Sequence, residues 1–223
     1  MLKYFLFILL LCFNSLNAMD KKPYHHIYKD GELFAFRNPE GGPKRDPNFK
    51  WNWKVFREEK KKLKINYPPE HVIDKQIVLK NLQRHKSDSF VMWLDHASFI
   101  IKLGDTTIIT DPVFEKNYGP LWFGPKKFVD SPLTLKELPK INVFLLTHNH
   151  YDHMSIRTIK NFPYKNSKAL MPLKLGKYFT RNGYNKKNVK EMDWFDKIKI
   201  NDDITITMLP AQHWSKRWIW GDG

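Results

Sequence analysis

A short segment near the middle of the chain carries four side chains that bind metal ions in many proteins. Residues 141–147 form an apolar run, and His148, His150, Asp152 and His153 follow it within six residues. Zinc takes imidazole nitrogen and carboxylate oxygen readily. A chance group of polar loop residues is the alternative, but the pattern H-x-H-x-D-H directly after a buried strand is too specific for it. The segment therefore predicts a metal site.

The spacing within this segment suits two ions. A loop at the end of a strand can fold back so that His148 and His150 face one ion, while Asp152 and His153 face the other. Two neighbouring cations need separate sets of ligands on one rigid support. The only cysteine is Cys12, near the N-terminus, so histidine and carboxylate must supply the ligands.

Short strands and tight turns begin at residue 90 and surround the metal-binding segment. Because strands alternate with helices, we expect a layered α/β domain. Ser155 is a candidate N-cap for the helix that follows the metal-binding loop. The expected strands are 90–94, 98–103, 106–110, 141–147, 168–171, 197–200 and 204–209, and the expected helices lie near 158–162 and 173–181.

The part of the chain before this domain is harder to interpret. Lys3, an apolar run at 4–13 and a polar stretch that ends at Ala18 are typical of a secretory signal peptide, with an uncleaved membrane anchor as the alternative. Residues 19–88 show no clear strand pattern and form an arm with a tryptophan-rich basic segment, in which 52–64 is a candidate helix. We therefore divide the chain into 1–18, 19–88 and 89–223, and expect an exported protein of the cell envelope or periplasm.

The composition excludes a largely disordered chain, because 42% of the residues are hydrophobic and 27% are charged. The formal net charge is +15. On charge alone, a solvated lysine-rich surface is the simpler interpretation. Attraction to an anionic membrane surface is the alternative.

Several segments together resemble the metallo-β-lactamase superfamily. These are M-W-L-D-H-A-S at 92–98, with Asp95 where the family has glycine, T-D-P at 110–112 and the H-x-H-x-D-H loop. The segments G-P-K-K-F at 124–128 and Q-H-W-S-K-R at 212–217 are more selective. They are similar to the subgroup of N-acylphosphatidylethanolamine-hydrolysing phospholipase D, and the resemblance covers about residues 90–219.

The resemblance implies ligands for two zinc ions. His148, His150 and His213 match the ligands of the first ion, and Asp152 and His153 match ligands of the second. It also implies that Asp152 is catalytic, because it would orient the nucleophile while binding the metal.

Two residues outside these ligand sets are also of interest. His96 is expected to be a structural residue beside the site. Asp111 is expected to support a metal-bound histidine, in addition to bonding to backbone in a turn.

The implied fold is an αββα sandwich, and the implied reaction is hydrolysis of a phosphodiester that releases N-acylethanolamine and phosphatidic acid. The implied partners are a phospholipid substrate and an anionic membrane surface, and nucleic acid is not favoured. One alternative is a hydrolase of the same fold that acts on a lactone, a cyclic phosphodiester or a nucleic acid. Another is an inactive zinc-binding fragment.

The sequence departs from the family pattern at its C-terminal end. The family has a metal-bridging aspartate and a late histidine after further strands, but only ten residues follow His213, and Asp222 is interpreted as a loop residue. We therefore expect only the N-terminal half of the sandwich, with the inner face of its sheet exposed, unless a second chain or a missing C-terminal half completes it. Residues 1–223 alone should bind about one zinc and hydrolyse the lipid poorly, because two protein ligands are too few for a second ion.

Overall fold

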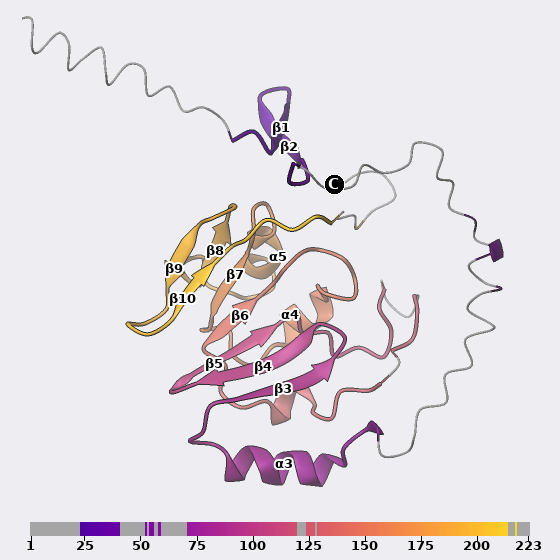
Figure 1. The fold of residues 1–223 in the computed structure, drawn as a ribbon, viewed down its shortest axis with the longest axis vertical. Coiled ribbons are helices and arrows are strands. Elements are labelled where there is room, and N and C mark those ends of the chain that lie inside the picture. Colours follow the sequence, from indigo (N-terminus) through magenta and orange to yellow (C-terminus); the bar gives the residue numbers. More distant parts are fainter. Residues whose placement is uncertain are drawn as a thin grey trace, which may run out of the picture.

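A six-stranded mixed sheet lies at the centre of the computed structural model (Figure 1). The structure describes residues 23–40, 52, 54–55, 58, 71–119, 124–127, 129–213 and 217. The predicted signal peptide, most of the predicted helix at 52–64 and Asp222 lie outside these residues.

The strand order follows the chain from β3 to β8 without a crossover between distant strands. The first three strands pair antiparallel, and β5 to β8 pair parallel. The strands are β3 (Phe90–Asp95), β4 (Ser98–Leu103), β5 (Thr106–Thr110), β6 (Val143–Leu145), β7 (Lys168–Pro172) and β8 (Val189–Met192). The predicted β4–β5 hairpin is confirmed, with Leu103 opposite Thr106.

Three helices pack on one face of the sheet. They are α3 (Lys75–Arg84), α4 (Ile156–Asn161) and α5 (Gly176–Thr180), and short 3-10 helices occur at Leu135–Glu137 and Lys186–Asn188. Ser155 caps α4 as predicted, because its hydroxyl oxygen accepts a hydrogen bond from the backbone N–H of Thr158 at 3.0 Å. The main hydrophobic core lies between these helices and the sheet and contains Val78, Ile100, Ile109, Phe144, Ile159, Met171 and Phe179.

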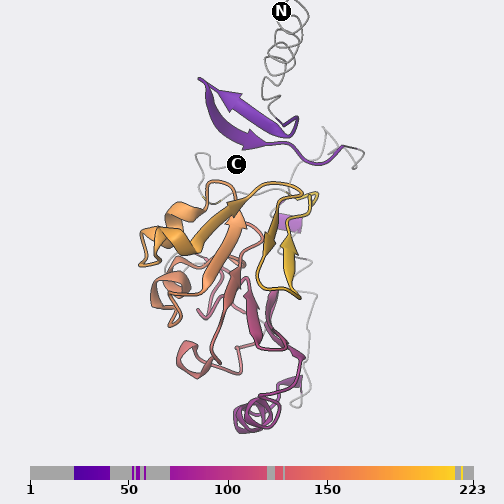
Figure 2. The same ribbon diagram turned by 90° about the vertical axis from the view of Figure 1, so that its left-hand side faces the viewer.

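A hairpin covers part of the opposite face. It consists of β9 (Lys197–Lys199) and β10 (Thr205–Thr207), and in Figure 2 it lies on the other side of the sheet from α4 and α5. Beneath it, Ile108, Val143 and Leu170 are at most 3% exposed. The prediction of an exposed inner face is therefore wrong for β5 to β7.

At β3 the same face is exposed among the described residues, as predicted. Val91 is 66% exposed and Trp93 is 45% exposed, because the β9–β10 hairpin covers only the other end of the sheet.

Residues 19–88 show no clear strand pattern in the sequence, but the structure forms two strands there. β1 (His26–Lys29) and β2 (Glu32–Phe36) form an antiparallel hairpin. Asp30 and Gly31 form its turn with φ angles of 51° and 83°, as expected for an Asp-Gly hairpin turn. Both Figure 1 and Figure 2 place this hairpin above one edge of the central sheet.

Two further elements were not predicted. Helix α3 is capped by Asp74, whose carboxylate accepts a hydrogen bond from the backbone N–H of Gln76 at 2.8 Å. The other element is β8, the last strand of the sheet. None of the described helices is long and apolar enough to cross a bilayer. The predicted layered α/β fold is confirmed for the described part of the chain.

Candidate metal centre

One edge of the sheet gathers the residues with metal-binding side chains. β3, β5, β6 and β8 run in the same direction, so the loops that follow them meet at this edge. These loops begin with His96, Asp111, the segment that contains His148, and Asp193. In sheets with parallel strands, this carboxyl edge is the usual place for a ligand site.

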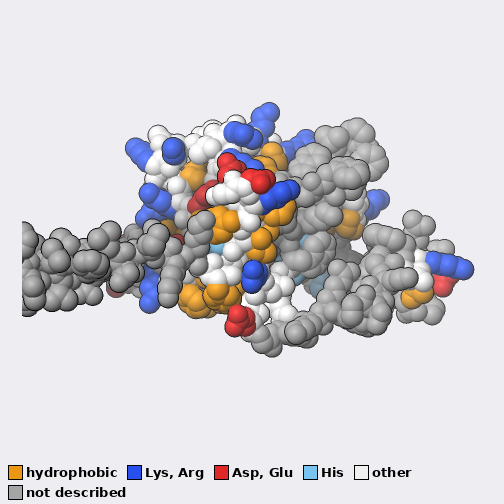
Figure 3. All heavy atoms as spheres, turned by 90° about the horizontal axis from the view of Figure 1, so that it is seen from above, with side chains coloured by type: hydrophobic (Ala, Val, Ile, Leu, Met, Phe, Trp, Pro, Cys, Tyr) orange, Lys and Arg blue, Asp and Glu red, His pale blue; other side chains and the backbone are white. Residues whose placement is uncertain are grey.

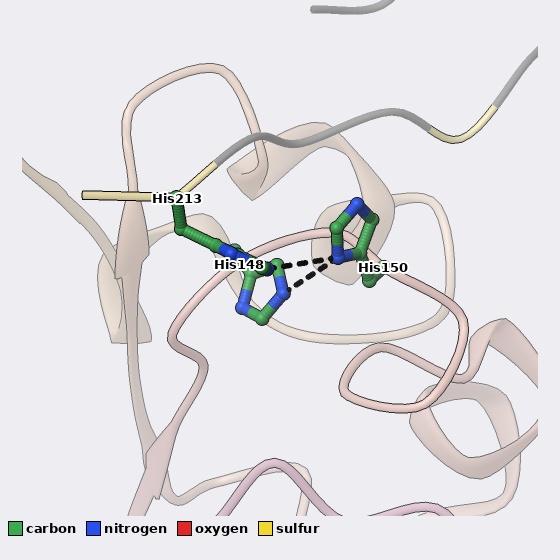
Figure 4. A group of neighbouring side chains, drawn as sticks. All are labelled: His148, His150 and His213. Atoms are coloured by element: carbon green, nitrogen blue, oxygen red, sulfur yellow. Dashed lines mark hydrogen bonds between the residues drawn. The ribbon is translucent and has the colours of Figure 1, made fainter. Parts of the chain in front are cut away.

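The first candidate group consists of His148, His150 and His213. His150 Nδ1 lies 2.9 Å from His148 Nε2 and 3.2 Å from His213 Nε2. Figure 4 shows that His148 and His150 come from the loop after β6, while His213 comes from the segment after β10. The three ring nitrogens lie within 4.8 Å of one another, so they can share one ion.

The surroundings of His148 and His150 favour the neutral form of these two rings. Burial lowers the pKa of His148 to about 3, and the adjacent rings of His153, His150 and His213 act in the same direction. Burial and then His213 lower the pKa of His150. A neutral imidazole offers a nitrogen lone pair, which is the form that binds a metal.

The second candidate group consists of His96, Asp152 and His153. Asp152 Oδ2 lies 3.0 Å from His96 Nε2 and 3.9 Å from His153 Nε2. The sequence analysis treated His96 as structural, but the structure adds its ring nitrogen to the group. The tight turn after β3, with φ of 33° at His96, brings the ring there. This group has three donors rather than the expected two.

Asp111 anchors the metal-binding loop through hydrogen bonds to Thr147 and His153. Its Oδ1 accepts a hydrogen bond from the backbone N–H of Thr147 at 2.7 Å, and its Oδ2 lies 2.8 Å from His153 Nδ1. Asp111 is only 1% exposed, so water does not compete for these bonds. This arrangement fits the predicted supporting role, because it leaves His153 Nε2 facing the second group.

Arg217 also holds this loop, at Asn149 and Met154, which was not predicted from the sequence. Its guanidinium donates to the backbone carbonyls of Asn149 at 3.0 Å and Met154 at 2.7 Å. It also lies 4.3 Å from the ring centroid of Tyr151, whose hydroxyl donates to the Arg217 carbonyl at 2.9 Å. The sequence signal that could have indicated this role is the position of Arg217 at the end of the Q-H-W-S-K-R segment.

A buried ion pair lies next to His96. Lys127 contacts the carboxylate of Asp95, and both side chains are only 3% exposed. The hydroxyl of Tyr118 donates to the same carboxylate at 3.4 Å, and burial followed by the charge of Asp95 raises the pKa of Tyr118. The aspartate that replaces the family glycine is therefore matched by a lysine of the G-P-K-K-F segment.

A cavity of about 660 Å³ opens beside both groups. Its lining includes the histidines His96, His148, His153 and His213. Most of the remaining wall is apolar and consists of Phe34, Phe36, Leu173, Leu175, Tyr178, Trp194, Met208 and Leu209. Two elements that were not predicted contribute to this wall. Phe34 and Phe36 come from β2, and Met192 comes from β8.

The donor set fits a transition metal such as zinc, because it combines neutral imidazoles with one carboxylate. The structure brings together all five residues that were predicted as ligands, and it adds His96. That these residues bind zinc stays a prediction.

A family model described as a beta-lactamase superfamily domain matches residues 106–222. An N-acyl-phosphatidylethanolamine-hydrolyzing phospholipase D of Caenorhabditis elegans is 32% identical over 59% of this chain and 40% of its own length. The mitochondrial protein of the same name from Saccharomyces cerevisiae is 30% identical over 56% of this chain and 27% of its own length.

A metal-dependent hydrolase of Caldivirga maquilingensis is 29% identical over 56% of this chain and 48% of its own length. The chain thus spans less than half the length of these three relatives.

Proposed function

This chain belongs to the beta-lactamase superfamily, and on that premise we propose that it acts in metal-dependent hydrolysis of a phosphodiester bond in an N-acylphosphatidylethanolamine-like lipid. Zinc is the proposed metal, because the donors are imidazoles and a carboxylate. The substrate class is suggested by the names of the relatives from Caenorhabditis elegans and Saccharomyces cerevisiae.

The observation that carries this proposal is that the cavity lining combines metal-binding histidines with apolar side chains. Histidines of both candidate metal groups line the cavity together with a larger set of apolar side chains. A phospholipid has the same two parts, a charged phosphodiester and long acyl chains. With the phosphodiester at the histidines, an acyl chain would run along the wall formed by residues such as Tyr178, Trp194 and Leu209.

Positive charge near the cavity supports an anionic substrate. Lys174 and Lys177 contribute to its lining, and the whole chain has a net charge of +15. Figure 3 shows several patches of hydrophobic side chains on the upper face, with lysine and arginine side chains along its rim and acidic side chains between them. Such a rim would draw an anionic head group toward the apolar cavity.

The chain's own side chains have distinct roles in this reaction. His148, His150 and His213 would hold one ion, and His96, Asp152 and His153 would hold the other. Divalent ions at these positions would polarise the phosphoryl oxygen and lower the pKa of an attacking water.

Asp152 would accept a hydrogen bond from the attacking water and orient it. Asp111 and Arg217 keep the ligands in place, since both hold the loop. The apolar wall would exclude bulk water from the reacting bond.

Hydrolysis of N-acylphosphatidylethanolamine in detergent micelles tests the reaction, with release of N-acylethanolamine followed by mass spectrometry. Slow release is expected from the zinc-loaded chain. His148→Ala should remove this release, while His85→Ala, an exposed histidine outside the site, should not change it. Equal rates for wild type and His148→Ala would contradict the proposal.

Lipid binding by the metal-free protein gives a second readout that does not depend on turnover. Leu209→Asp, which places a charge in the cavity wall, should weaken binding of N-acylphosphatidylethanolamine about tenfold or more. Leu103→Asp is the matched control, because Leu103 is also exposed and lies at the opposite end of β4 from the site. Equal weakening by both changes would contradict the proposed position of the acyl chain.

A second candidate function is hydrolysis of a different substrate by the same metal groups. The relative from Caldivirga maquilingensis is named only as a metal-dependent hydrolase. Zinc-dependent, His148-dependent hydrolysis of a lactone, together with no binding of the phospholipid, would favour this function over the first.

A further inference from the structure

We propose that His25, His26 and Asp193 form a further site for a divalent transition-metal ion, separate from the two groups at the cavity, which fastens the β1–β2 hairpin to the sheet. The three residues come from opposite ends of the described chain. His26 is the first residue of β1, His25 directly precedes it, and Asp193 directly follows β8.

The donor atoms converge on the carboxylate of Asp193. His25 Nε2 lies 2.7 Å from Oδ1, and His26 Nε2 lies 2.8 Å from Oδ2. One donor atom from each residue falls within 4.8 Å of the others. Two imidazoles and one carboxylate are a ligand set that zinc accepts, and they leave a fourth position for water.

The surroundings of His26 favour an ion over a simple hydrogen bond. Its Nδ1 lies 3.3 Å from the hydroxyl oxygen of Tyr28, to which it can donate its proton. The Nε2 atom then carries a lone pair. Nε2 is buried, and it makes no hydrogen bond of normal geometry with any described residue, although Asp193 Oδ2 is only 2.8 Å away.

A lone pair so close to a carboxylate oxygen is repelled unless a proton or a metal ion lies between the two atoms. In histidines that bind metals, the ring nitrogen that does not bind the ion usually donates a hydrogen bond to another group, as Nδ1 of His26 can do to Tyr28. The contact between His26 and Asp193 therefore fits two ligands of one ion.

His25 is held in a fixed orientation. Its ring stacks on Trp194, with 4.0 Å between ring centroids and 13° between the ring planes, and the residue is 6% exposed. A ligand that is already positioned loses little side-chain entropy when an ion binds. The stack also places a fluorescent side chain next to the proposed ion.

The proposed ion would act on the cavity through the hairpin. Phe34 and Phe36 of β2 form part of the cavity wall, and the carbonyl of Leu33 accepts a hydrogen bond from Lys174 at 2.6 Å. Asn38, just after β2, accepts a hydrogen bond from the backbone N–H of His213 at 3.2 Å. An ion at the base of the hairpin would therefore stabilise both the wall and the His213 segment.

Zinc content of the full chain, measured by mass spectrometry after equilibrium dialysis, tests the site. His26→Ala and Asp193→Asn should each lose about one zinc per chain relative to wild type. His85→Ala is the matched control, because His85 Nδ1 also lies 2.8 Å from a carboxylate, that of Asp88, but without a second histidine. The losses from His26→Ala and from His148→Ala should add in the double variant, because the two sites are separate.

Two further measurements separate metal binding from a structural ion pair. Cobalt should quench tryptophan fluorescence, and the part of this quenching that Trp194→Phe removes should also be removed by His26→Ala. Zinc should raise the Tm of wild type more than that of His26→Ala. If His26→Ala lowers the Tm of the metal-free protein but leaves zinc content and cobalt quenching unchanged, the contact is an ion pair alone and the proposal is wrong.

Discussion

His153 Nδ1 lies 2.8 Å from Asp111 Oδ2, although the two residues are 42 positions apart in the sequence. The same carboxylate accepts hydrogen bonds from the backbone N–H and the hydroxyl of Thr147 at 2.7 and 2.5 Å. Asp111 thus fixes both the start of the metal-binding loop and the orientation of one of its histidines.

Replacing this carboxylate should weaken metal binding without removing a ligand. Asp111→Asn keeps the side-chain shape but loses the negative charge that orients and polarises His153. We expect the zinc affinity of the group formed by His96, Asp152 and His153 to fall by about 10-fold to 100-fold, as measured by calorimetry. Asp88→Asn removes a similar but exposed contact with His85 and should leave the affinity unchanged. Equal affinities for wild type and Asp111→Asn would contradict the supporting role.

The buried pair of Asp95 and Lys127 should contribute strongly to folding. Lys127→Met leaves the carboxylate of Asp95 buried without its cation, which should lower the free energy of unfolding by about 3–5 kcal/mol. The control is Lys199→Met, because the Lys199–Asp202 pair is exposed and should contribute about 1 kcal/mol or less. Urea unfolding measures both changes, and similar losses in the two variants would contradict the prediction.

The Glu137–Lys75 ion pair should make stability depend on pH. Lys75 Nζ lies 2.6 Å from Glu137 Oε1, and this hydrogen bond, followed by those from Thr134, lowers the pKa of Glu137 from 4.5 to about 2. The unfolded state therefore binds more protons than the folded state between these values. The stabilising contribution is present above pH 4.5 and is lost as the pH falls toward 2.

The variant Lys75→Met tests this dependence. Its Tm should be lower than that of wild type at about pH 6, and the difference should shrink as the pH falls through the window between the two pKa values. Thermal unfolding followed by circular dichroism measures it. A difference that stays constant down to pH 2 would show that Lys75 acts by packing rather than by charge.

Phe144 should be a main contributor to the core beneath the metal-binding loop. Its ring packs edge-on against Phe162 and Phe179, with 5.1 Å between centroids in both pairs. Phe144→Ala should lower the free energy of unfolding by about 3–5 kcal/mol, because it leaves a cavity. Phe195, which is 64% exposed, provides the control Phe195→Ala, and urea unfolding should show a far smaller change there.

The local features of the site could be predicted from the sequence, because neighbouring residues determine them. The apolar strand β6, the loop from His148 to His153 and the cap at Ser155 follow from short patterns. The resemblance to a known family added His213, which lies 63 residues from His150.

The features that were missed depend on contacts between distant residues. His96 joins Asp152 only because β3 and β6 end at the same edge of the sheet, which no local pattern states. The β1–β2 hairpin is an exception, since Asp30-Gly31 between two short apolar stretches was a readable turn signal.

The contact between His25 and Asp193 also has a consequence for the order of folding. While the sheet is unformed, this contact closes a loop of 168 residues, whereas the bond between Ser98 and Asp111 closes one of 13. The longer loop costs about 2 kcal/mol more in chain entropy. Formation of the sheet removes much of that cost, so we expect the β1–β2 hairpin to dock after β3 to β8. In the folded protein it should also be the first of these elements to detach, and its amide protons should exchange with solvent before those of β5 to β7.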